Sequence, residues 1–174
     1  MSEKKTSVLV VNCDCLLINT SANLCHLAYL KGLAEAGCSV TLLSKSRHGY
    51  RTDPSLSYPD GVKLCLHRGA TVYEWLSVIK RSKQKAVRSA GNAAAPSEGG
   101  KSSRSLIGSL KKKCRSILYG KDGLHSRFLK KARKFSPKEE FDYVISLSTP
   151  ITSHKLACEL VSSGQVKCGH WIQI

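Results

Sequence analysis

Ser7-Val8-Leu9-Val10-Val11 and Ser39-Val40-Thr41-Leu42-Leu43 are two short apolar runs near the start of the chain. Runs of this length, rich in branched residues, are typical of strands buried in a parallel sheet. Between them, apolar residues recur at helical spacing, and Gly37 follows where a left-handed residue ends a helix. Strand, helix and strand in this order predict a right-handed βαβ unit. The helical apolar residues are Leu24, Leu27, Ala28, Leu30, Leu33 and Ala34.

The rest of the chain continues the alternation of strands and helices. Further strands are predicted at 62–66, 141–148 and 168–174, and helices at 72–85 and 152–163, the last closed by Gly164. This alternation predicts an α/β fold: a Rossmann-like, open, mostly parallel sheet with helices on both faces. In such sheets the ligand crevice lies beyond the carboxyl ends of the strands.

A strongly basic segment interrupts this pattern. The net charge is +16, and residues 80–134 hold 17 Lys and Arg against two acidic residues, Glu98 and Asp122. Within one domain spanning 1–174, residues 89–105 are predicted to be a flexible linker and 106–135 a basic amphipathic helical insert. The insert either lies on an anionic membrane or packs on the sheet with its charges in water. The basic residues expected to face a membrane are Lys111, Lys112, Lys113, Arg115, Lys130 and Lys131.

Composition narrows the class of protein. No apolar stretch approaches the roughly 20 residues needed to cross a bilayer, and the first apolar run is too strand-like for a signal peptide, so a cytoplasmic location is expected. The eight cysteines are therefore predicted to be reduced and mostly buried as small hydrophobes. No C-x-x-C pair occurs, and no metal site is predicted. His26 and His170 are predicted to be packed, neutral imidazoles.

Three segments together resemble the N-terminal domain of family 4 retaining glycosyltransferases, which have the GT-B fold. The resemblance covers most of the chain outside 45–105 and depends on the order and spacing of the segments. The family often has a Gly-Gly pair in its first loop, where this sequence has Thr20-Ser21-Ala22-Asn23. The matching residues are Val8-Leu9-Val10-Val11 through Leu33-Ala34-Glu35-Ala36-Gly37-Cys38-Ser39-Val40-Thr41-Leu42-Leu43; Tyr119-Gly120-Lys121-Asp122; and Phe141-Asp142-Tyr143-Val144-Ile145-Ser146 with Ser148-Thr149-Pro150 and Gly169-His170-Trp171-Ile172.

The resemblance implies the acceptor-binding half of an enzyme. The complete enzyme would transfer a sugar from a nucleotide-sugar donor to a polysaccharide or lipid-linked saccharide, with no bound metal or other cofactor. The donor-binding C-terminal domain would be absent from residues 1–174, and the catalytic residues would lie beyond Ile174. The isolated chain is then expected to be inactive and to need that domain in cis or in trans. A lipid-linked acceptor would bring it to the inner face of the cell membrane.

Two polar loops are the candidate substrate-binding residues. Each follows a predicted strand and opens a helix, where free backbone N–H groups and the helix dipole favour anions. The other interpretation is that these side chains only cap helices, with Ser21 or Asn23 capping the first. The candidates are Asn19, Thr20, Ser21 and Asn23 in the first loop, and Ser148, Thr149, Ser153 and His154 in the second.

The alternative function is a small basic binding module for nucleic acid or an anionic membrane. Its charge suits phosphate contacts. However, residues 80–134 offer only Tyr119 and Phe128 as aromatic stacking platforms besides the basic side chains, and no helix-turn-helix or zinc-finger pattern occurs. The sequence therefore argues against nucleic acid as the partner.

Overall fold

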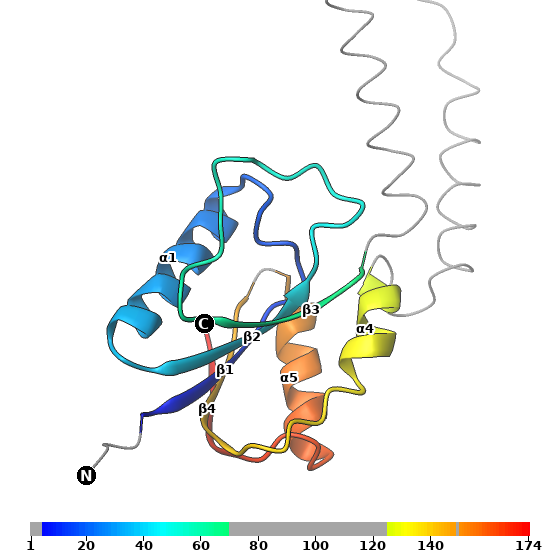
Figure 1. The fold of residues 1–174 in the computed structure, drawn as a ribbon. Helices are drawn as coiled ribbons and strands as arrows, with labels where there is room; N and C mark the ends of the chain where they lie inside the picture. The colour runs from blue at the N-terminus through cyan, green and yellow to red at the C-terminus, as the bar shows by residue number, and fades with distance from the viewer. Residues whose placement is uncertain (1–4, 70–124, 149) are drawn as a thin grey trace, which may run out of the picture.

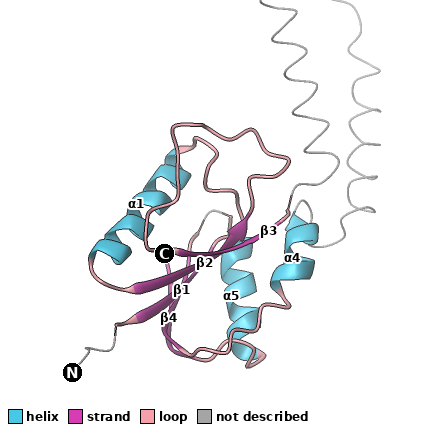
Figure 2. Ribbon diagram, in the orientation of Figure 1, coloured by secondary structure: helices cyan, strands magenta, loops and turns pink. Residues whose placement is uncertain are grey.

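The computed structural model describes residues 5–69, 125–148 and 150–174, which form an α/β domain (Figures 1 and 2). Their five strands form one sheet in the order β3-β2-β1-β4-β5, and every neighbouring pair is parallel. The predicted open parallel α/β sheet is therefore confirmed, and its strand order is consistent with a Rossmann-like domain. The strands are β1 Ser7–Val11, β2 Ser39–Lys45, β3 Lys63–His67, β4 Phe141–Ser146 and β5 Cys168–Gln173.

Among the described residues, three helices cover the two faces of the sheet. They are α1 Ser21–Glu35, α4 Ser126–Ala132 and α5 Thr152–Ser162. Helix α1 lies on one side of the sheet, and α4 and α5 lie on the other (Figure 1). Alternate residues of β1 separate accordingly: Val8 and Val10 pack under α1 with Leu27 and Leu30, whereas Leu9 and Val11 pack with α4 and α5. Helices on both faces, as predicted, bury Val8, Leu9, Val10 and Val11 of β1.

Two glycines end helices as the sequence predicted. Gly37 has φ 82° and Gly164 has φ 73°, values that residues with a Cβ rarely adopt. After α1, the N–H of Gly37 donates to the carbonyl of Ala34 and the N–H of Cys38 to that of Leu33. This is a Schellman motif, which satisfies the last carbonyls of the helix and turns the chain into β2.

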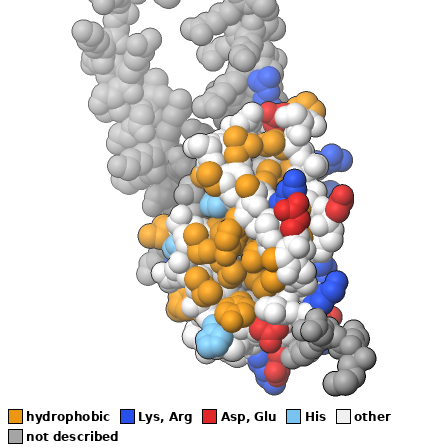
Figure 3. Space-filling view, turned by 90° about the vertical axis from the view of Figure 1, so that its left-hand side faces the viewer, with side chains coloured by type: hydrophobic (Ala, Val, Ile, Leu, Met, Phe, Trp, Pro, Cys, Tyr) orange, Lys and Arg blue, Asp and Glu red, His pale blue; other side chains and the backbone are white. Residues whose placement is uncertain are grey.

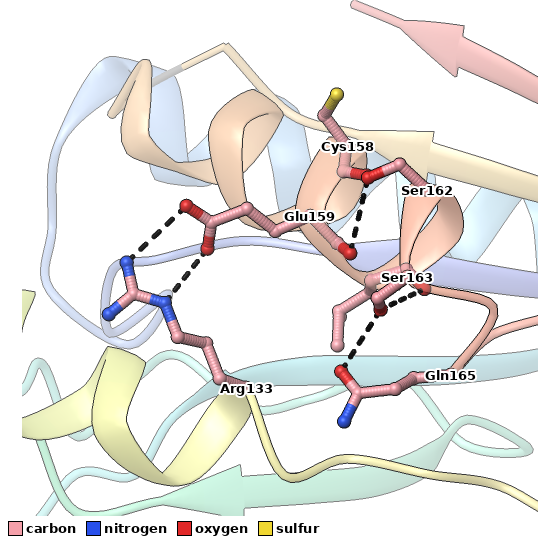
Figure 4. A network of polar contacts seen from close by, with 7 residues as sticks. Arg133, Cys158, Glu159, Ser162, Ser163 and Gln165 are labelled. Carbon is pink, nitrogen blue, oxygen red and sulfur yellow. Dashed lines mark hydrogen bonds and ion pairs between the residues drawn. The ribbon is translucent and has the colours of Figure 1, made fainter.

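Helix α4 is tied to α5 by a charged pair as well as by core packing. Arg133 directly follows α4, and its Nε lies 2.8 Å from Oε2 of Glu159 on α5, while Nη2 lies 3.4 Å from Oε1 (Figure 4). In the last turn of α5, the hydroxyl of Ser162 donates to the carbonyl of Cys158 at 2.6 Å. Both charged side chains are about one-third exposed, so Phe128 and Leu129 of α4, which are buried, supply most of the docking energy.

Strand β5 is an exposed edge, which the sequence did not predict. All of its residues except Cys168 are exposed, and His170 stacks on Tyr143 with ring centroids 5.4 Å apart. The prediction of a packed His170 is therefore wrong, because none of the three described helices covers the α1 side of this edge strand. Ile172 pairs with Ile145 and is 39% exposed, and hydrophobic side chains gather across the α1 side of the molecule (Figure 3).

The cysteine prediction is confirmed only in part. The seven described cysteines are free thiols, and Cys13 and Cys15 are fully buried in the core. Cys25 and Cys158 are exposed instead, because they lie on the outward faces of α1 and α5. Apolar neighbours in the sequence do not decide which face of a helix a residue occupies.

Several predictions lie outside the described residues. These are the helix at 72–85, the linker at 89–105 and the first part of the basic insert, with Lys111, Lys112, Lys113 and Arg115. Among the residues that the structure describes, no helix combines the length and the apolar character needed to cross a membrane.

Candidate functional site

The candidate site lies where β1 and β4 end, side by side. From β1 the chain continues through α1 to β2 on one side, and from β4 through α5 to β5 on the other. The two connections therefore leave the sheet in opposite directions and onto opposite faces (Figure 1). This is a topological switch point, the position at which open α/β sheets bind ligands.

The loop after β1 is built from its own polar groups. The Asn12 side-chain oxygen accepts from the N–H of Asp14 at 2.7 Å, and the Asp14 carboxylate accepts from the N–H of Cys15 at 2.8 Å. The Ser44 hydroxyl, at the end of β2, donates to the Asp14 carbonyl at 2.6 Å. These bonds hold the loop in one conformation over the sheet edge.

The loop after β4 is joined to this first loop through Ser153. Ser153 is fully buried, and its Oγ accepts from the N–H of Cys13 at 2.9 Å, across 140 residues of sequence. The thiol of Cys13 is buried beside it, and burial raises its pKa to about 12. Cys13 is therefore a protonated core residue at neutral pH and not a nucleophile.

Two histidines contact the loop after β1. The N–H of Asp14 fixes the orientation of the Asn12 amide, so the Asn12 Nδ2 faces and donates to Nδ1 of His26 on α1 at 3.4 Å. Burial lowers the pKa of His26, although the charge of Asp14 opposes this, so its ring is neutral at pH 7. On the other side of the sheet, Nδ1 of His125 lies 3.0 Å from the carbonyl oxygen of Cys13 and donates to it.

A third histidine, His154, is held at the end of β4. Its Nδ1 lies 2.7 Å from Oγ of Ser146, the last residue of that strand. The indole Nε1 of Trp171, on β5, donates to the same oxygen at 3.3 Å. Ser146 is fully buried, whereas His154 is half-buried in the first turn of α5.

The first predicted loop, 19–23, is exposed at three of its predicted site residues. Asn19, Thr20 and Ser21 are exposed, and Asn19 Nδ2 donates to the Asp53 carboxylate at 2.7 Å. Donation from the hydroxyl and N–H of Ser55 and from Asn19 lowers the pKa of Asp53. Asn19 therefore ties this loop to residues 53–55.

The prediction that Ser21 or Asn23 caps α1 is wrong. The cap is Thr20, whose Oγ1 accepts from the N–H of Asn23 at 3.2 Å, and Ser21 is the first helical residue. Asn23 is buried, and its Nδ2 donates to the carbonyls of Cys15 and Ile18 at 3.1 and 2.9 Å. Its amide is therefore used to close the loop before the helix.

The second predicted loop is divided in a similar way. Ser148 is exposed and His154 is half-buried, so both are accessible to a ligand, whereas Ser153 is buried against the first loop. Thr149 lies outside the described residues. The loop from 12 to 18 links the two predicted groups, since it bonds to Asn23 and to Ser153.

Sequence reasoning missed several polar residues of this edge. Ser146 and Lys45 sit at the ends of apolar strands, and a polar residue that ends such a run was the available signal. Lys45 is 1% exposed, and its Nζ lies 5.6 Å from the centroid of the Tyr50 ring, a cation–π distance. His125 had no sequence signal, because its partner, the carbonyl of Cys13, is remote in the chain.

Two hollows lie away from this edge. One of about 660 Å³ lies between α1 and residues 55–61, and one of about 370 Å³ lies at the start of β4 beside His170. Among the described residues, no group of three or more His, Cys, Asp or Glu side chains could hold a metal ion. The described side chains of the switch-point edge offer hydrogen-bond donors and acceptors.

No protein-family model, curated protein or solved structure matches this chain. The class that its described residues define is an α/β domain with a parallel five-stranded sheet and a polar switch-point edge.

Proposed function

We propose that this chain is the acceptor-side domain of a retaining GT-B glycosyltransferase. The complete enzyme transfers a sugar from a nucleotide-sugar donor to a polysaccharide or lipid-linked saccharide. The observation that carries the proposal is the bond between Ser153 and Cys13. It ties the second predicted group to the loop 12–18, which also bonds to Asn23 of the first predicted group. The strand order supports it, because this order puts the crevice between β1 and β4.

The residues of this edge suit a sugar acceptor. Exposed Asn19, Thr20, Ser21 and Ser148, with half-buried His154, present amide, hydroxyl and imidazole groups without an acidic side chain in the first turn of α1 or α5. Such groups bond sugar hydroxyls, and the first turns of the two helices favour an anionic phosphate. In the complete enzyme this chain binds and orients the acceptor, and the second domain holds the donor.

The test is a binding experiment on the full chain labelled with ¹⁵N. A polyprenyl diphosphate-linked monosaccharide in detergent micelles is titrated in, with empty micelles as the control. We expect the amide signals of 12–23 and 146–154 to move, and substitution of His154 by Gln to weaken the response. Substitution of Ser162, at the far end of α5, by Ala is the matched control. No movement at saturation, or movement confined to α4, would contradict the proposal.

A second candidate function is binding to an anionic membrane surface. Helix α4 carries exposed Lys130 and Lys131 in its last turn, followed by exposed Lys134, with no acidic residue in its first turn. Its apolar residues Phe128, Leu129 and Ala132 pack in the core, whereas these lysines are exposed to solvent. Membrane approach is compatible with a lipid-linked acceptor.

A further inference from the structure

Ser146 joins three elements at the candidate site. It ends β4, its Oγ lies 2.7 Å from Nδ1 of His154 on α5, and it accepts from Nε1 of Trp171 on β5 at 3.3 Å. The serine is fully buried, so its hydroxyl forms hydrogen bonds with these partners and not with bulk water.

The hydrogens of this network can be assigned from the types of its groups. The indole N–H of Trp171 can only donate, so it occupies a lone pair of the Ser146 oxygen. The single hydroxyl hydrogen of Ser146 can point to Nδ1 of His154 at 2.7 Å or to the carbonyl of Ile172 at 3.4 Å, and in the second case Nδ1 would itself be the donor to Ser146. The first distance is that of a good O–H hydrogen bond and the second is at the outer limit. The hydroxyl therefore donates to Nδ1, and the proton of the neutral imidazole sits on Nε2.

We infer that Ser146 and Trp171 are positioning residues that hold His154 as the Nε2–H tautomer, a hydrogen-bond donor to an oxygen of the acceptor substrate. Nδ1 is used on the buried side, so Nε2 is directed away from Ser146, on a ring that is only half-buried. The identity of the ligand rests on the proposed function, whereas the tautomer follows from the network alone.

His125 provides a contrast within the same molecule. Its Nδ1 lies 3.0 Å from the Cys13 carbonyl oxygen, which can only accept. Nδ1 of His125 must therefore carry a proton. The two rings beside the switch point are expected to be opposite tautomers when both are neutral, and each serves as the reference for the other.

The test is the histidine ¹⁵N spectrum of the full chain at about pH 8, where an ordinary imidazole is neutral. Long-range ¹H–¹⁵N correlations distinguish the two tautomers, and His154→Gln and His125→Gln variants assign the signals. We expect His154 to show Nε2–H and His125 to show Nδ1–H. Ser146→Ala should convert His154 to a tautomer mixture and leave His125 unchanged, and Ser146→Thr, which keeps the hydroxyl, should restore the original pattern.

An Nδ1–H signal for His154 in the unsubstituted chain would overturn the inference, as would a spectrum that Ser146→Ala leaves unchanged. If Ser146→Ala does not fold, the unsubstituted chain and Ser146→Thr still decide the tautomer. The saccharide titration is a separate readout. Ser146→Ala should weaken binding roughly tenfold, the scale of one hydrogen bond, and Ser162→Ala, at the far end of α5, is the control. If His154 has the expected tautomer but the chain binds no saccharide, the proposed function is refuted and the positioning role stands. If the chain binds the saccharide and Ser146→Ala does not weaken that binding, the role of His154 as a donor to the acceptor is refuted.

Discussion

At the scale of single residues, the site depends on buried polar side chains that hold loops in place. Asn12, Asn23, Ser146 and Ser153 are each buried at 1% exposure or less, and each bonds to a backbone group or a side chain across the switch-point edge. A buried donor or acceptor that loses its partner costs more than the bond itself contributed. The residues around the site are therefore sensitive to small substitutions.

Ser153→Ala tests this sensitivity. The change leaves the buried N–H of Cys13 without the oxygen that now accepts from it at 2.9 Å. We expect the free energy of unfolding to fall by about 1–3 kcal/mol, measured by urea denaturation. Ser162→Ala, at an exposed serine of the same helix, should change it by less than about 0.5 kcal/mol. Equal values for the two variants would mean that Ser153 does not brace the loops.

At the scale of elements, the two helices that open at the site begin differently. Helix α1 has a side-chain cap, Thr20, whereas α5 begins after Ile151 without one. The first N–H groups of α5 instead bond to carbonyls just before the helix: the N–H of Ser153 donates to the carbonyl of Pro150, and the N–H of His154 donates to the carbonyl of Ile151. Stability at the start of α1 therefore depends on one exposed threonine.

Thr20→Ala is expected to destabilise the protein by about 1 kcal/mol, because the N–H of Asn23 loses its acceptor. Urea denaturation measures the change, and hydrogen exchange at 22–25 locates it. Thr20→Ser keeps the capping oxygen and should stay close to the original stability. Ser21→Ala serves as the control at the neighbouring exposed position. If Ser21→Ala proved the more costly change, the cap would be misplaced.

At the scale of the whole molecule, the exposed lysines of α4 and the candidate site belong to different elements. The candidate site lies at the carboxyl ends of β1 and β4, whereas Lys130 and Lys131 lie on α4, which contacts β3 at one edge of the sheet. The opposite edge, β5, carries exposed Trp171 and Ile172 and contains no Lys, Arg, Asp or Glu. A surface that binds an anionic membrane and a site that binds an acceptor can therefore be altered independently.

Reversing the charge of Lys130 and Lys131 to Glu should weaken binding of the full chain to vesicles of anionic lipid. Each basic residue near such a surface contributes about 1 kcal/mol, so we expect a loss of roughly tenfold or more. Sedimentation with vesicles measures it, with neutral vesicles as the blank. Reversing Lys63 and Lys167 makes the same change in net charge at the amino-terminal end of β3 and just before β5, and should have less effect. If both double variants weaken vesicle binding equally, the binding depends on the net charge of the chain and not on the position of the lysines on α4.

The sequence predicted the elements better than it predicted the site. Apolar runs and helix-ending glycines located all five strands and the helices α1 and α5, since these patterns are local in the chain. The exposed β5, the Thr20 cap and the inward-facing Asn23 were missed. In each case the outcome depends on what covers or faces a residue, which local patterns do not contain.

The amino-acid sequence by itself determined the α/β class, the parallel sheet and the two polar loops that follow β1 and β4, because hydrophobic periodicity and turn chemistry are properties of neighbouring residues. Only the tertiary structure decided which of those polar residues face a ligand. Ser153 bonds to Cys13, and Ser146 to His154 and Trp171, only after β1, β4 and β5 lie side by side. A hydrogen bond between residues far apart in the chain forms because the packed sheet brings its partners within about 3 Å, and this distance is a property of the fold.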